Sequence, residues 1–255
     1  MNTFPGLDYL AIFVGGTCAG IMNAVAGGGT LVSFPILLWA GRDPILANAT
    51  NALALWPGSL AGAWGFRREI VAFPRLLRFL LPAAVIGGLV GGCLLLATPS
   101  KMFLLFVPYL ILFATVVLAA KSALARLGRG STENRSGAHA GLLFAGQLAV
   151  SVYGGYFGAG MGILMLAALG LYGVTDFHER NALKNLLSAT TNGLAGLFFI
   201  IAGAIRWDDA LALGVGAVVG GLLGAAIGRR LSSRVLQGVA IAVGVVATAA
   251  LLLRR

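Results

Sequence analysis

The residues of this sequence that could bind a small ligand gather around a run of glycines. Gly27, Gly28 and Gly29 separate two apolar runs, and Thr30 and Ser33 follow directly. A helix that starts after Gly29 would point its free backbone N–H groups into the glycine turn, and a helix N-terminus carries roughly half a positive charge. Glycines also let a ligand approach the backbone closely. The pattern predicts a site for a small anion, with hydroxyl donors from Thr30 and Ser33.

The glycine pattern returns in the second half of the chain. Gly158 and Gly160 each lie 131 residues after their counterparts, the first and third glycines of the first run. A further match pairs residues 86–91 with residues 219–224, which lie 133 positions later. The chain is therefore predicted to contain one structural unit twice. The glycine pairs of this further match are expected to pack helices closely.

Amide and phenol side chains accompany both glycine runs. Asn51 follows the first run, and its counterpart Asn185 lies 134 residues later. Tyr153 and Tyr156 precede the second run and could bring phenol donors to it, and Asn192 is a further amide in an apolar span. Amides inside membrane helices also bond neighbouring helices. A role in ligand binding and a role in helix packing are therefore both open for these side chains.

Lys184 is the charged residue beside the second group, directly before Asn185. It falls near the start of an apolar span, where a lysine can extend its charge to the membrane interface. The alternative is that it attracts an anion from the cytoplasmic side. The glycine runs have a plain alternative too, because either could be only a tight turn.

The composition places these residues in a membrane protein. Of 255 residues, 59% are hydrophobic and 10% are charged, whereas soluble domains carry about 25% charged residues. The net charge of +10 comes from basic residues in short loops between apolar runs, so we attribute it to membrane topology and expect no nucleic-acid partner. The expected partners are the lipid bilayer and a small anionic substrate, and a homodimer is an open alternative to a monomer.

The apolar runs predict helices, since none alternates with period two. Residues 30–40 are about 16 Å long as a helix, too short for a hydrocarbon core of about 30 Å. Each glycine run is therefore expected to break a hairpin that enters and leaves the membrane on one side. The expected hairpins pair Leu7–Ala26 with Thr30–Ala40 and Ala140–Phe157 with Met161–Tyr172, and the expected spans are Pro44–Phe66, Phe79–Ala97, Met102–Ala120, Asn181–Ile205, Ala210–Ile227 and Val235–Leu253.

The fold class that follows is an all-α integral membrane protein of two inverted repeats. Each repeat would be a broken helix hairpin plus three transmembrane helices, and the odd number of crossings would invert the second copy. The expected divisions are residues 1–125 for the first repeat, 126–139 for a cytoplasmic linker and 140–255 for the second repeat. The segment Arg67–Arg78 is expected to be a basic loop.

The basic residues predict which side faces the cytoplasm. In this topology thirteen of them lie inside and five outside, so the positive-inside rule places both termini outside the plasma membrane, the inner membrane of a bacterial cell. Those outside are Arg42, Lys101, Arg206, Arg254 and Arg255; those inside are Arg67, Arg68, Arg75, Arg78, Lys121, Arg126, Arg129, Arg135, Arg180, Lys184, Arg229, Arg230 and Arg234.

Inverted repeats with glycine-broken helices are typical of secondary transporters, whose substrates bind near the midplane of the membrane. The apolar spans contain no Asp or Glu for a proton relay, and the sequence has no Walker motif for ATP. It also has no Ser/His/Asp or Cys/His set, so we expect neither an enzyme nor a cofactor or metal ion. An anion-selective channel and, less favoured, a membrane enzyme or assembly factor are the alternatives.

At the first glycine run the sequence resembles the TauE/SafE family. The residues that carry this resemblance are Gly27, Gly28, Gly29, Leu31, Pro35, Gly41, Pro44, Thr50 and Asn51. The second copy departs from the pattern, because Lys184 and Asn185 stand where a Thr-Asn pair would be expected. The resemblance implies export of sulfite or organosulfonates such as sulfoacetate, with a permease for other small organic anions as the alternative.

Overall fold

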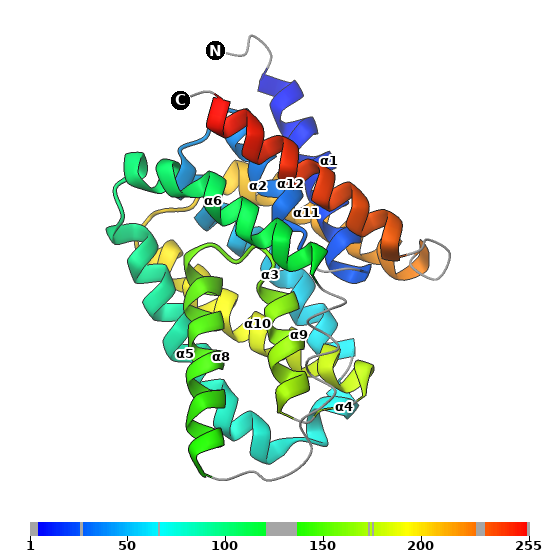
Figure 1. The fold of residues 1–255 in the computed structure, drawn as a ribbon. Coiled ribbons are helices and arrows are strands. Elements are labelled where there is room, and N and C mark those ends of the chain that lie inside the picture. Colours follow the sequence, from blue (N-terminus) through cyan, green and yellow to red (C-terminus); the bar gives the residue numbers. More distant parts are fainter. Residues whose placement is uncertain are drawn as a thin grey trace.

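The structure is a computed structural model, and the parts of the chain that it describes are entirely helical. These parts are residues 5–25, 28–65, 67–120, 137–172, 174, 176–227 and 233–253. Gly27, Arg254, Arg255 and residues 126–136 of the predicted linker lie outside them. The all-helical fold that the sequence predicted is confirmed for the described residues (Figure 1).

Eleven helices make up the described chain. Those of the first half are α1 (Pro5–Val25), α2 (Thr30–Trp39), α3 (Pro44–Gly65), α4 (Arg67–Val71), α5 (Pro74–Ala97) and α6 (Ser100–Ala119). Those of the second half are α8 (Gly137–Tyr156), α9 (Met161–Leu171), α10 (Phe177–Ile201), α11 (Trp207–Ile227) and α12 (Ser233–Leu253). The short second segment of each predicted hairpin is confirmed, because α2 has 10 residues and α9 has 11.

Two aspartates mark equivalent helix starts in the two halves. The Asp43 carboxylate accepts hydrogen bonds from the N–H groups of Ile45 and Leu46 at the start of α3, at 2.9 and 3.2 Å. Asp176, 133 residues later, accepts one from the N–H of Glu179 in the first turn of α10, at 3.0 Å. Such caps satisfy backbone donors that have no partner within the helix. The repeated cap extends the internal repeat beyond the glycines.

Several predicted boundaries were wrong, among them the end of the linker, because α8 begins at Gly137 and the linker was predicted to run to residue 139. The segment Arg67–Arg78 is not a loop, since it forms α4 and the first turn of α5. Pro74 explains the start of α5, because a proline in the first helical turn loses no hydrogen bond. Helix α10 begins four residues before the predicted Asn181, at the Asp176 cap, and ends at Ile201. The chain then turns through Gly203, which has a φ of 68°.

Glycines bring helices of the two halves into backbone contact. Helix α1 lies along α11, where a β-carbon placed on Gly16 would stand 2.2 Å from the carbonyl oxygen of Leu213. Helix α5 lies along α8, where one placed on Gly91 would stand 2.2 Å from the carbonyl oxygen of Val152 (Figure 1). Small residues permit such close approach in membranes. Gly87, Gly91 and Gly220 make these contacts, as the sequence predicted. Gly88 instead faces Thr191 of α10, and a β-carbon on Gly221 would have no atom within 4 Å.

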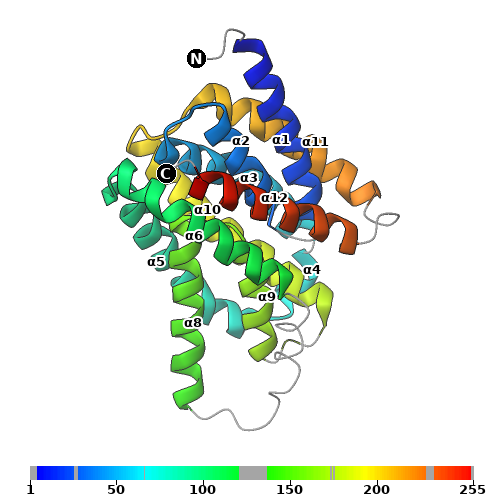
Figure 2. The same ribbon diagram turned by 45° about the horizontal axis from the view of Figure 1, so that its top comes forward.

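Helices α3 and α10 lie against one another at the centre of the fold (Figure 2). The indole N–H of Trp56 donates to the carbonyl oxygen of Ala189 at 2.9 Å. Further along α10, Gly196 faces Leu53, which lies earlier on α3. Residues later on one helix therefore meet residues earlier on the other.

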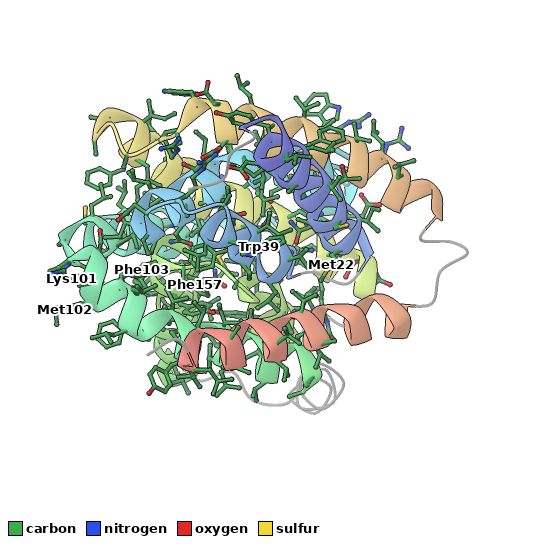
Figure 3. The ribbon with its side chains drawn as sticks, turned by 90° about the horizontal axis from the view of Figure 1, so that it is seen from above. Met22, Trp39, Lys101, Met102, Phe103 and Phe157 are labelled. Atoms are coloured by element: carbon green, nitrogen blue, oxygen red, sulfur yellow. The ribbon has the colours of Figure 1, made fainter. Side chains whose placement is uncertain are left out.

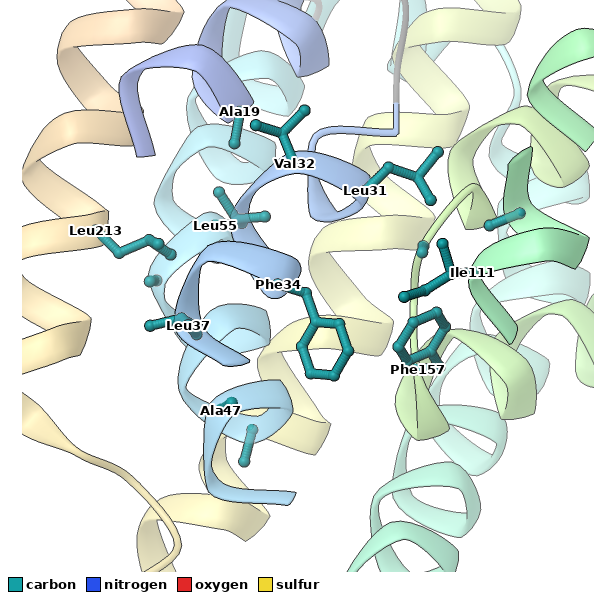
Figure 4. Close-up of a cluster of buried hydrophobic side chains, with 14 of the residues drawn as sticks. Ala19, Leu31, Val32, Phe34, Leu37, Ala47, Leu55, Ile111, Phe157 and Leu213 are labelled. Atoms are coloured by element: carbon teal, nitrogen blue, oxygen red, sulfur yellow. The ribbon is translucent and has the colours of Figure 1, made fainter. Parts of the chain in front are cut away.

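The outer surface and the core are both apolar. By length and composition α5 and α6 could each cross a membrane, and large apolar side chains of α6 such as Met102 point outward (Figure 3). A buried cluster fills the centre of the fold, with Phe34 and Phe157 facing one another within it (Figure 4). The exposed apolar surface suits lipid, so the described chain has the surface and core of a membrane-embedded helical protein.

Candidate functional site

The first glycine turn is held by its own side chains. The N–H of Gly29, which precedes α2, donates to the Asn23 side-chain oxygen at 2.8 Å. A β-carbon on Gly29 would lie 2.4 Å from the carbonyl oxygen of Ala19, so only glycine fits here. Gly28 has a φ of 84°, in the left-handed region that glycine adopts without strain. Gly27 lies outside the described residues. The turn is tight because both its backbone conformation and its packing require glycine.

Ser33 and Asn51 meet directly behind this turn. The Ser33 hydroxyl lies 2.5 Å from the Asn51 side-chain oxygen and 3.3 Å from the carbonyl oxygen of Gly29. Both side chains are buried, and Thr30 is half-buried beside them. A hydroxyl and an amide that the sequence assigned to one site are thus in contact. Their hydrogen bond attaches α3 to the first turn of α2.

The second glycine turn is built differently. Gly158 and Gly160 have φ values of 78° and 74°, and Gly160 immediately precedes α9. The Tyr153 hydroxyl donates to the carbonyl oxygen of Ala159 at 2.6 Å, so this phenol holds the turn in place. A β-carbon on Gly160 would lie 3.5 Å from Ala114, an ordinary contact distance. At Gly160, the second turn therefore depends on backbone conformation rather than on a lack of space.

Lys184 lies over the first turn of α9. Its Cδ would be 3.3 Å from a β-carbon placed on Gly162, so the aliphatic stem crosses the space that this glycine leaves open. Lys184 and Asn185 are half-buried, whereas Thr50 and Asn51, their counterparts in the first half, are buried. A basic side chain at a helix N-terminus adds positive charge where the helix dipole already favours an anion. The structure thus brings Lys184 to the second turn.

The two turns approach the same stretch of α6. A β-carbon on Gly28 would be 4.0 Å from Leu118, and one on Gly160 would be 3.5 Å from Ala114. Leu118 and Ala114 are four residues apart, which is about 6 Å along a helix. Aromatic rings close the gap, since Phe34 of α2 and Phe157 of the second turn meet edge to face at 5.2 Å (Figure 4). The two hairpins therefore meet inside the molecule.

Asn48 joins α3 to the second hairpin, and our sequence-based site had omitted it. Its amide N–H₂ donates to the carbonyl oxygen of Tyr156 at 2.8 Å. Its side-chain oxygen is buried and has no hydrogen-bond partner. Asn48 stands three residues before Asn51, so both amides lie on one face of α3. This spacing of amides in an apolar span is the sequence signal that could have identified Asn48.

Two predicted residues lie away from the meeting point of the turns. The Tyr156 hydroxyl is 3.4 Å from the Thr98 hydroxyl at the end of α5. Its ring lines an open apolar groove of about 490 Å³ together with Leu94, Ala145, Leu148, Ala149, Val152 and Tyr153. Asn192 is half-buried on α10, two helical turns beyond Asn185 and thus about 10 Å further along.

An ion cluster connects the loop after α2 to the start of α11. Arg42 makes two hydrogen bonds to the Asp209 carboxylate, at 2.9 and 3.0 Å, and Arg206 makes one at 2.9 Å. Asp209 is fully buried, so this double pairing compensates for its burial. The backbone N–H of Arg206 also donates to the Thr50 hydroxyl at 3.1 Å. Within the described residues, no group of His, Cys, Asp and Glu side chains could hold a metal ion.

Comparison with known proteins identifies a family and several relatives. The family described as "Sulfite exporter TauE/SafE" matches residues 12–251. A "Probable membrane transporter protein" of Haemophilus influenzae is 30% identical over 224 residues, which cover 86% of this chain and 85% of the relative. "Probable membrane transporter protein YfcA" of Escherichia coli K12 is 29% identical over 91% of this chain and 85% of its own length. No solved structure matches the chain.

Proposed function

The chain belongs to the sulfite exporter TauE/SafE family and is a membrane transporter, and on this premise we propose that it exports small sulfur-containing anions. The proposed substrates are sulfite and organosulfonates such as sulfoacetate. Export of an anion needs no ATP, because an inside-negative potential expels each negative charge with about 2.3 kcal/mol per 100 mV.

The observation that carries this proposal is the approach of the two glycine turns to one stretch of α6. Each turn leads into a helix N-terminus, and backbone N–H groups there favour oxyanions. Lys184 adds a positive charge at the second turn. A sulfite or sulfonate group has three oxygens and could accept hydrogen bonds from several such donors at once. We place the substrate between the turns, nearer to Lys184.

We further propose that the two halves are inverted repeats. Helices α3 and α10, which are equivalent in the repeat, cross in opposite directions. Helix α1 runs parallel to α11, since Gly16 and Gly20 face Leu213 and Ala217 in the same order. In a hairpin followed by three crossings, the first and fourth segments of one repeat are antiparallel. A parallel pairing across repeats is therefore expected only when the second copy is inverted.

The lengths of the short helices support a site near the membrane midplane. Helix α2 has 10 residues and α9 has 11, so each spans about 15–16 Å between its glycine turn and the loop that follows. This is about half of a hydrocarbon core of 30 Å. If both loops lie at membrane surfaces, both turns fall near the middle.

The proposed orientation places both termini outside the plasma membrane. The starting turn of α1 and the end of α12 lie at one end of the molecule, and α4 and the start of α8 lie at the other (Figure 1). Arg42 and Arg206, two of the five basic residues predicted outside, both pair with Asp209. The positive-inside rule counts basic residues, and five on this side against thirteen on the other support the proposed orientation.

Transport by purified protein in liposomes tests the function. We expect saturable uptake of sulfite or sulfoacetate that is stimulated by unlabelled substrate on the opposite side of the membrane. Flux that does not saturate and shows no such stimulation would favour the channel alternative. Transport of carboxylates with no transport of sulfite or sulfonates would contradict the proposed substrate class.

Cysteine labelling of intact cells tests the orientation. We expect an impermeant reagent to label Asp208→Cys and to leave Ser131→Cys unlabelled until the cells are opened. Labelling of both variants from outside would contradict the inverted topology.

A further inference from the structure

We infer that, among the sulfur-containing anions of the proposed class, the protein prefers those that carry a hydrogen-bond donor in addition to the negative group, and that Asn48 recognises this donor. The inference rests on the proposed function, because it concerns the substrate of the same site. It starts from the side-chain oxygen of Asn48, which is buried and has no hydrogen-bond partner. Buried polar atoms in proteins are almost always paired, so an unpaired one calls for an explanation.

The position of Asn48 places this oxygen close to the second glycine turn. Asn48 is 2% exposed and its amide N–H₂ is bound to Tyr156, in the last turn of α8 before the second glycine turn. Only the N–H₂ group of an amide can donate to a carbonyl oxygen, so this bond fixes which atom is left unpaired. Asn51, one turn further along α3, contacts Ser33 beside the first glycine turn. Asn48 therefore lies where α3 connects the two hairpins.

The chemistry of the atom restricts what can bind it. An amide oxygen only accepts hydrogen bonds. A sulfonate or fully ionised sulfite group also only accepts, so it cannot pair with this oxygen. A ligand with an O–H or N–H group can. Such ligands are hydroxyalkane- and aminoalkanesulfonates, and hydrogensulfite among the inorganic anions. The negative group would occupy the helix N-termini and Lys184, and the donor would face Asn48.

The atom is fully covered in this structure, so the ligand reaches it only when the second hairpin moves relative to α3. Such a movement would break or lengthen the hydrogen bond from the Asn48 amide to the carbonyl oxygen of Tyr156. The O–H or N–H group of the substrate would then donate a hydrogen bond to the side-chain oxygen of Asn48. Asn48 is thus placed to distinguish substrates while the site opens and closes.

Two sulfonates of equal size test the inference. In 2-hydroxyethanesulfonate a hydroxyl replaces the terminal methyl group of propane-1-sulfonate. We expect the wild-type protein to bind the hydroxyl compound about tenfold more tightly or better, as one buried hydrogen bond allows. Asn48→Leu and the smaller Asn48→Ala should bring the affinity ratio close to one while both compounds still bind. The ratio is measured on one preparation, so it does not depend on the folded fraction.

Gln147→Leu is the matched control. Gln147 is also a fully buried amide with an unpaired side-chain oxygen, but it lies nine residues before Tyr156, about 13 Å along α8. Its substitution should leave the ratio unchanged. If Gln147→Leu also brings the affinity ratio close to one, the preference for the hydroxyl compound arises from packing, and the inference is overturned.

The other outcomes separate the inference from the proposed function. Equal wild-type affinity for the two sulfonates, or a preference that survives in both Asn48 variants, would overturn the inference alone. So would binding that requires Na⁺ in the wild type and loses this requirement in Asn48→Leu, since the oxygen would then serve a cation. Failure of the wild type to bind either sulfonate or sulfite would overturn the proposed function and this inference with it.

Discussion

The two glycine turns of this protein occupy equivalent positions in the repeat and are held in different ways. In the first turn, Asn23 binds the N–H of Gly29, and Ser33 binds Asn51. In the second, the Tyr153 hydroxyl binds the carbonyl oxygen of Ala159, and the aliphatic stem of Lys184 packs over Gly162. The first turn therefore uses its polar side chains to fix itself. The second adds a basic side chain whose neighbouring amide, Asn185, is half-buried.

We propose that the two glycine turns have different roles. Where the hydroxyl and amide groups of the first turn bind one another, they are less available to a ligand. At the second turn, Lys184 lies beside the N-terminus of α9, and the sequence has Lys184-Asn185 where the first half has Thr50-Asn51. We therefore expect the first turn mainly to shape the site and the second turn to provide most of the binding energy for the anion. Four measurements test this contrast between the turns.

The largest expected effect is that of Gly29→Ala on folding. The added methyl group would overlap the backbone oxygen of Ala19, at 2.4 Å, which cannot move without distorting α1. We expect little monodisperse protein on size-exclusion chromatography. Gly160→Ala has space, and its left-handed backbone should cost only about 1–2 kcal/mol. Gly41→Ala, with a φ of 75° and open surroundings, measures that strain alone. Equal stability of the Gly29 and Gly160 variants would remove the contrast between the turns.

The next effect is that of Lys184→Ala on anion binding. A charge-assisted hydrogen bond contributes about 1.5–3 kcal/mol, so its loss should weaken binding roughly ten- to a hundredfold. Lys184→Arg should keep most of the affinity. Thr50→Ala, at the equivalent position of the first half, should change affinity little. Isothermal titration with sulfite or sulfoacetate measures all three variants. A small effect that disappears at high salt would make Lys184 a long-range attractor instead of a ligand.

A smaller effect should separate the two equivalent asparagines. Asn51→Ala removes the nearer acceptor of the buried Ser33 hydroxyl and leaves the carbonyl oxygen of Gly29, so it should lower the free energy of unfolding by about 0.5–1.5 kcal/mol. Asn185 is half-buried, so Asn185→Ala should change stability less and binding more. Thermal unfolding and substrate titration of both variants make the comparison. The double variant Ser33→Ala, Asn51→Ala should show non-additive losses, because the two side chains contact one another. Strict additivity would contradict the hydrogen bond.

The smallest expected effect is that of Arg206→Ala. Its side chain is 42% exposed, and exposed ion pairs contribute about 0.2–1 kcal/mol. Arg42→Ala should cost more, since Arg42 is 15% exposed and makes two bonds to Asp209. This pair ties the loop after the first hairpin to α11. The loop after the second hairpin is instead held locally, by Arg180 donating to the carbonyl oxygen of Val174. Equal melting temperatures of the two arginine variants would mean that the first loop is not anchored in this way.

Much of this fold follows from the sequence alone. Apolar run length and glycine position are local properties, and they predicted the short α2 and α9 and the glycine contacts of α5. The segment Arg67–Arg78 was mistaken for a loop because its charge density resembles that of a connection. Its side chains are also compatible with a helix at a membrane surface, and Pro74 starts one there.

The pairing of polar side chains was decided only by the tertiary structure. The contact of Asn48 with Tyr156 joins residues 108 positions apart, and that of Arg42 with Asp209 joins residues 167 apart. Such contacts depend on the depth and rotation of each helix. Periodicity fixes the rotation of a helix only when one face is polar and the other apolar. Helices that are apolar on every side leave it open, so close packing at glycines determines which few polar groups meet.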